Sequence, residues 1–133
     1  MDTRTTETVV ECTRASDEGR ASFPEVVAKL MAAGVEGYHA DLRRAETTYY
    51  LPDGESAAVP GAPLAAMPAR DFSPHGIVGA LRAIQAGRFS YRDFCERIAA
   101  AGCVGYIVSL AGRRAVYFGR TGETYVEMFP PAT

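Results

Sequence analysis

The sequence has no long apolar run and no surplus of one charge. Its 133 residues contain no stretch near the roughly 20 apolar residues that cross a bilayer. The first residues, from Met1 to Thr5, lack the apolar stretch of a signal peptide. We therefore expect a soluble, cytoplasmic protein without a membrane partner. The 14 basic and 16 acidic side chains leave a net charge of -2, so nucleic acid is not an expected partner either.

Sequence signatures of metal, cofactor and catalytic sites are also missing. The three cysteines, Cys12, Cys95 and Cys103, lack the close spacing of zinc ligands. No phosphate-binding glycine loop, dinucleotide fingerprint or serine-hydrolase elbow occurs. The sequence thus predicts no metal, no cofactor and no catalytic residue. An odd number of cysteines also argues against a secreted disulfide framework, and we expect the three thiols to pack in the core.

An internal repeat is present instead. Shifting the chain by 68 positions aligns residues 19–60 with residues 87–128 without a gap, and 12 of the 42 pairs are identical. The same register extends backwards, which gives two similar halves, 7–60 and 75–128, joined by a linker rich in proline and alanine over 61–74. Two copies are too few for a solenoid. We therefore predict a single domain with internal duplication and pseudo-twofold symmetry.

Each half begins with two predicted helices. A hydroxyl precedes a carboxylate by three residues at Ser22 and again at Ser90, the spacing that caps a helix start. Apolar residues then recur at helical spacing. Gly34 and Gly102 follow, and glycine adopts the left-handed conformation with which many helices end. A weaker helix precedes each of these, over about 7–17 and 76–86.

The pattern then changes to alternation, which is typical of strands. In the first half one side carries Tyr38, Ala40 and Leu42, and the other carries His39, Asp41 and Arg43. Turn residues around Gly54 and Gly122 indicate further hairpins. The sequence therefore predicts an α+β fold, in which helix-helix-meander units form one mainly antiparallel sheet with helices packed on one face.

The linker is too short and too apolar to be a flexible tether. We expect it to run over the surface and to pack through Leu64, Met67 and Phe72. Either Ser73 or Asp71 should cap the helix that follows.

The polar strand side in the first half is the candidate ligand-binding site. A carboxylate near an imidazole raises its basicity, as general-base chemistry requires, so His39, Asp41 and Arg43 are candidates. Tyr38 and Tyr106 join them because the repeat brings both toward the pseudo-twofold axis. The plainer interpretations are a solvent-facing polar strand for the first three and a structural role for the repeated tyrosines.

Four runs of sequence are similar to a known family. They are Gly34 to Leu42, Ala83 to Gly87, Ala101 to Tyr106 and Glu127 to Pro130. Together they resemble an uncharacterised bacterial, prophage-associated family of the YbcV and YdfO type, sometimes labelled phage envelope protein. The resemblance covers about 22–130 and implies a small duplicated α+β fold. It implies no catalytic residue, ligand or mechanism.

A non-catalytic binding or interaction module is the function that these observations favour. The alternative is a small enzyme or metabolite-binding protein that uses His39, Asp41 and Arg43. The partner is an unknown small molecule or protein. A homodimer is one possibility, because the second half places Ile107 on the sheet face that helices leave uncovered, next to an edge strand near the C-terminus. The competing explanation is that the linker, with Leu64 and Met67, covers Ile107.

Overall fold

The computed structural model describes residues 1–130, which form four helices and six strands. In chain order these are α1 (Thr3–Asp17), α2 (Phe23–Ala32), β1 (Gly37–Asp41), β2 (Glu46–Tyr50), β3 (Ser56–Pro60), α3 (Pro74–Gln85), α4 (Tyr91–Ala100), β4 (Cys103–Ser109), β5 (Arg114–Gly119) and β6 (Thr124–Met128). Both halves therefore have the order helix, helix and three strands. None of the helices within residues 1–130 is long and apolar enough to cross a membrane.

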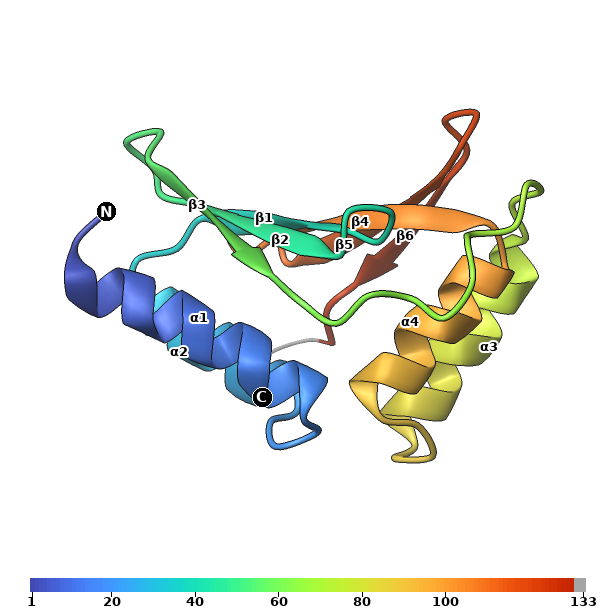
Figure 1. Ribbon diagram of the computed structural model, residues 1–133, viewed down its shortest axis with the longest axis horizontal. Coiled ribbons are helices and arrows are strands. Elements are labelled where there is room, and N and C mark those ends of the chain that lie inside the picture. Colours follow the sequence, from blue (N-terminus) through green and yellow to red (C-terminus); the bar gives the residue numbers. More distant parts are fainter. Residues whose placement is uncertain (131–133) are drawn as a thin grey trace.

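The six strands form one antiparallel sheet in the order β3-β2-β1-β4-β5-β6. The pair α1 and α2 lies under the first half of the sheet, and α3 and α4 lie under the second (Figure 1). No helix of residues 1–130 lies on the opposite face, called the open face below. The expected α+β fold with helices on one face is confirmed, and β6 is an edge strand as expected.

The central pairing of β1 with β4 joins the two halves. His39 lies opposite Ile107, which is its own counterpart at the offset of 68. The pair Tyr38 and Val108 on one side is likewise equivalent to the pair Tyr106 and Ala40 on the other side. The residues with positive φ in the described chain also fall into pairs at this offset, namely Gly19 with Gly87, Gly34 with Gly102, Ala45 with Arg113 and Gly54 with Gly122. These regularities support an internal duplication, which stays a prediction about the origin of the chain.

Two glycines let the central strands approach closely. A Cβ atom added to Gly37 would lie 2.5 Å from the carbonyl oxygen of Val108, and one added to Gly105 would lie 2.7 Å from that of Ala40. Both distances are shorter than real Cβ contacts. The two glycines are equivalent at the offset of 68, and so are the two carbonyl groups. The same close contact between a glycine and a backbone carbonyl therefore occurs twice along the pairing of β1 with β4.

The helix ends follow the expected local chemistry. Ser22 and Ser90 each form a capping box with the carboxylate three residues later. Gly34 and Gly102 have φ values of 82° and 89°, so the left-handed conformation is confirmed at both. Ser73 caps α3 by accepting a hydrogen bond from the Gly76 backbone.

Helix α1 begins four residues earlier than expected. The side chain of Asp2 caps it by accepting a hydrogen bond from the Thr5 backbone at 2.7 Å. The first turn has no apolar side chain in its helical residues, so hydrophobic periodicity could not reveal it.

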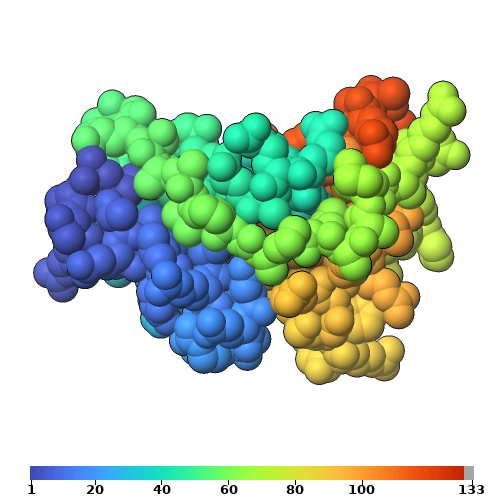
Figure 2. Space-filling view, in the orientation of Figure 1, coloured from blue at the N-terminus to red at the C-terminus, as the bar shows by residue number. Residues whose placement is uncertain are grey.

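The linker runs along the boundary between the sheet and the helices, where Figure 2 shows it crossing the molecule from the first half to the second. Leu64 and Phe72 pack against the core as expected. Met67 does not, since 69% of it is exposed. Backbone hydrogen bonds tie the linker to α4, including one from Ala69 to the carbonyl of Ala99. Ile107 stays 48% exposed, so the competing explanation, in which the linker covers it, is wrong.

Candidate functional site

Asp41 supports the turn between β1 and β2. Its Oδ1 atom accepts hydrogen bonds from the backbone N–H groups of Arg43 at 3.0 Å and Arg44 at 3.1 Å. Ser109 does the same in the second half, because its hydroxyl accepts from the backbone of Gly112 at 2.9 Å. The carboxylate and the hydroxyl occupy equivalent positions and satisfy equivalent turns.

Arg43 lies in that turn rather than on the strand, because β1 ends at Asp41. The expectation of three polar side chains along one strand face is therefore correct for His39 and Asp41 only. No hydrogen bond joins these two side chains in residues 1–130.

We expect Asp41→Ala to lower the free energy of unfolding by about 1 kcal/mol, because two backbone donors lose their acceptor. Asp41→Ser should recover most of the loss, since serine performs this task in the second half. Urea unfolding followed by circular dichroism would measure both. An Asp41→Ala variant as stable as the original protein would show that the turn does not depend on this side chain.

His39 lies at the centre of the open face. Its ring centroid is 5.7 Å from that of Phe118, and both rings lie beside Gly105. A Cβ atom at residue 105 would come within 3.3 Å of the Nε2 atom of His39. The imidazole is thus in a half-exposed aromatic contact and does not line either of the two described cavities.

Tyr38 and Tyr106 lie on the other face of the sheet, buried under the helices. Their ring centroids are 6.4 Å apart, and each contacts a further tyrosine, Tyr49 at 5.3 Å or Tyr117 at 5.1 Å. Burial raises the pKa of both hydroxyls well above the ordinary tyrosine value. The structure therefore separates these two tyrosines from His39 by the thickness of the sheet and places them in the core.

The hydroxyl groups of two of the buried tyrosines have structural partners. Tyr106 shares a hydrogen bond with Tyr91 of α4, and Tyr49 shares one with Thr13 of α1 at 2.8 Å. Burial raises the pKa of Tyr49 to about 12. These phenols are protonated at neutral pH, and each ties a strand to a helix.

The cysteines are free and pack in or near the core. Cys12 and Cys103 are buried, and Cys95 is partly buried. Burial raises the pKa of the Cys95 thiol to about 12, which leaves almost no thiolate, the reactive form, at neutral pH. Within residues 1–130 no three His, Cys, Asp or Glu side chains gather as a metal site would need.

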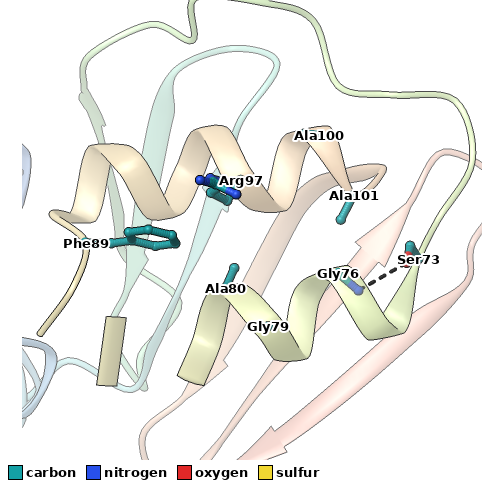
Figure 3. A pocket seen from close by; sticks show the side chains of 8 residues that line it. All are labelled: Ser73, Gly76, Gly79, Ala80, Phe89, Arg97, Ala100 and Ala101. Carbon is teal, nitrogen blue, oxygen red and sulfur yellow. Dashed lines mark hydrogen bonds between the residues drawn. The ribbon is translucent and has the colours of Figure 1, made fainter. Parts of the chain in front are cut away.

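Two cavities lie in equivalent places of the two halves. The larger, about 470 Å³, lies between α3 and α4, and Figure 3 shows it from close by. The smaller, about 250 Å³, lies between α1 and α2. Gly76 and Gly79 line the first, whereas their counterparts Thr8 and Glu11 line the second. The sequence patterns described above did not predict the larger cavity, although two glycines inside a helix, where the other half has Thr8 and Glu11, are a usable signal.

The open face carries an apolar patch on its second half. Its members, called the open-face patch, are Ile107, Val116, Phe118, Val126 and Met128 of β4, β5 and β6. The strand register places Ile107 opposite Val116 and Val116 opposite Val126, so the side chains form a continuous row. Val126 is 44% exposed and Met128 is 51% exposed.

Comparisons with known proteins place the chain in a family without an assigned activity. A family described as "Protein of unknown function (DUF1398)" matches residues 20–127. Uncharacterised proteins of Mycobacterium tuberculosis and Mycobacterium bovis are 35% identical over 119 residues, which cover 80% of this chain. The chain spans 66% of the length of these relatives, slightly less than two thirds. The expected YbcV or YdfO type stays a prediction, and the chain belongs to the DUF1398 family.

Proposed function

We propose that this protein is a non-catalytic interaction module that uses the open-face patch to bind a second copy of itself. The observation that carries the proposal is the exposure of Ile107 on β4 and of Val126 and Met128 on β6, the two strands that flank β5. Single exposed apolar residues are common, whereas a contiguous group on one face is typical of an interaction surface.

The distribution of polarity on the open face favours a particular arrangement. The first half carries Asp41, Glu46, His39 and Thr48 there, which suit contact with water. A twofold axis that stacks β4 to β6 of one copy on the same strands of the other would bury apolar side chains against each other. The polar half would then lie at the rim, as in many interfaces.

The size of the patch suits a weak dimer. Strands about 4.8 Å apart with residues about 3.4 Å apart give the three strands β4, β5 and β6, at five residues each, a projected area of roughly 250 Å² in each copy. Side chains protrude, so the accessible area exceeds this projection. Two such surfaces fall at the low end of interface sizes, where association is weak and depends on protein concentration.

The cellular setting belongs to the same proposal. Prophage association is supported by the sequence resemblance to the YbcV and YdfO type. A cytoplasmic location is likewise proposed.

We expect Ile107→Asp to weaken dimerisation by about 30-fold or more, because a carboxylate in this apolar row would be buried without a partner in the dimer. Light scattering and sedimentation over a range of protein concentrations would measure the dissociation constant. Circular dichroism should show that the variant keeps its secondary structure, since residue 107 faces solvent in the single chain.

Met67→Asp is the matched control, because it makes a similar change at a more exposed apolar residue in the linker, outside the open-face patch. This variant should dimerise as the original protein does. A monomeric original protein at about 100 μM, or an Ile107→Asp variant that still dimerises, would overturn the proposal.

A further inference from the structure

The cavity between α3 and α4, called the α3–α4 groove below, differs from the cavity between α1 and α2 because two of its lining residues have no side chain. Thr8 and Glu11 of α1 line the smaller cavity, and Gly76 and Gly79 of α3 hold the equivalent positions in the larger. The cavity lined by the two glycines has a volume of about 470 Å³, and the cavity lined by Thr8 and Glu11 has a volume of about 250 Å³. The larger value lies within the range of roughly 300–1,000 Å³ usual for small-molecule sites.

Packing explains only one of these glycines. A Cβ atom on Gly76 would lie 2.9 Å from the Cβ atom of Ala101, so this glycine lets α3 and α4 approach closely. A Cβ atom on Gly79 would have nothing within 4 Å. Glycine inside a helix is unfavourable relative to alanine, and no contact in the described chain offsets this at Gly79. Its effect is to keep the floor of the groove open.

Arg97 supplies one cationic group to the groove. Its guanidinium carbon lies 5.0 Å from the centre of the Phe89 ring, and both side chains are on the groove in Figure 3. No ion pair to Arg97 occurs within residues 1–130. Asp93, one turn earlier on α4, accepts a hydrogen bond from the Ser90 backbone. The stacked guanidinium therefore keeps its in-plane N–H groups for a ligand.

The chemistry of the groove selects one class of anion. A guanidinium binds a carboxylate through two parallel hydrogen bonds. The rest of the lining is mostly short and apolar, including Gly79, Ala80 and Ala100, and offers contact to an alkyl or aryl group rather than to further charges. Among the lining residues that the structure describes, a phosphate dianion would find one cation, Arg97.

We propose that the α3–α4 groove binds a small organic monocarboxylic acid, with its carboxylate on Arg97 and its apolar part over Gly79. This site is on the helix side of the molecule, so it is independent of the open-face patch and goes beyond the proposed dimer. The first half differs, because Glu11 lines the smaller cavity at the position of Gly79 and brings a carboxylate, paired with Arg20 at 2.9 Å, to that place.

Titration of the isotope-labelled protein with hexanoate, followed by NMR, tests the proposal. We expect saturable shifts of the Gly76 and Gly79 amides and of the Arg97 Nε–H signal. The series acetate, butyrate and hexanoate should bind about fourfold more tightly for each methylene that becomes buried. Hexanamide, which lacks the charge, and inorganic phosphate, which lacks the apolar part, should bind at least tenfold more weakly than hexanoate.

Two variants and a control locate the site. Gly79→Glu introduces the residue type of the first half, and it should weaken hexanoate binding at least tenfold without lowering the melting temperature, since glutamate favours helix. Arg97→Gln should weaken binding to a similar degree. Lys29→Gln, the equivalent change in the first half, should leave binding unchanged. Absence of saturable shifts with hexanoate, equal binding of hexanamide or phosphate, or undiminished binding by either groove variant would overturn the proposal.

Discussion

Replacing Gly102 by alanine is expected to lower the free energy of unfolding by about 3 kcal/mol or more, whereas the same change at Gly34 should cost only about 1 kcal/mol. Both glycines have positive φ and end equivalent helices. They differ in their surroundings: a Cβ atom on Gly102 would overlap the backbone carbonyl of Asp71 in the linker, and one on Gly34 would have nothing within 4 Å.

The Gly34→Ala variant is the internal control, because it carries the conformational cost alone. The difference between the two variants then measures the steric cost at the linker. Urea or thermal unfolding of both proteins gives the two values. Equal losses would show that the linker moves aside easily, and no loss in either variant would contradict the left-handed conformation at both helix ends.

Leu30→Ala and Ile98→Ala should each lower the free energy of unfolding by about 2–5 kcal/mol. The two residues are equivalent at the offset of 68, and both are fully buried in one hydrophobic cluster that includes residues of both halves. If the halves form one cooperative domain, each variant should show a single transition at a lower denaturant concentration, and every spectroscopic probe should report the same midpoint.

Met31→Ala is the matched control, because Met31 follows Leu30 on the same helix but is 53% exposed. It should change stability by no more than about 0.5 kcal/mol. Two separate transitions in Leu30→Ala, with the second half unfolding as in the original protein, would contradict the single-domain prediction.

The predictable part of the fold is the part that short-range chemistry decides. The capping serines, Ser22 and Ser90, and the glycine stops, Gly34 and Gly102, act within a few residues, so the sequence reveals them. The order of strands within each half follows from short turns. The central pairing of β1 with β4 does not follow from any local signal, because the two strands are separated by two helices, two strands and the linker.

The candidate site was less predictable for a physical reason. A carboxylate at the end of a strand looks the same in sequence whether it faces a ligand or caps the next turn, and Asp41 does the latter. Strand alternation already placed Tyr38 and His39 on opposite sides, which excludes a joint site on one face. The α3–α4 groove is open because Gly79 has no side chain, and the two glycines inside the helix are its only indirect signal in the sequence of residues 1–130.

The central seam of the sheet has the geometry of a subunit interface inside one chain. If either half were separated from the other, it would expose β1 or β4 as a free edge with unpaired backbone groups. Because His39 and Ile107 are each other's counterparts across this seam, the register that joins the halves is also the register in which one half could pair with a copy of itself. If two chains exchanged their halves, β1 of one chain would pair with β4 of the other, and every strand pairing would be preserved. The linker between β3 and α3 connects the two halves, so its length and path determine whether β1 pairs with β4 of the same chain or of another chain.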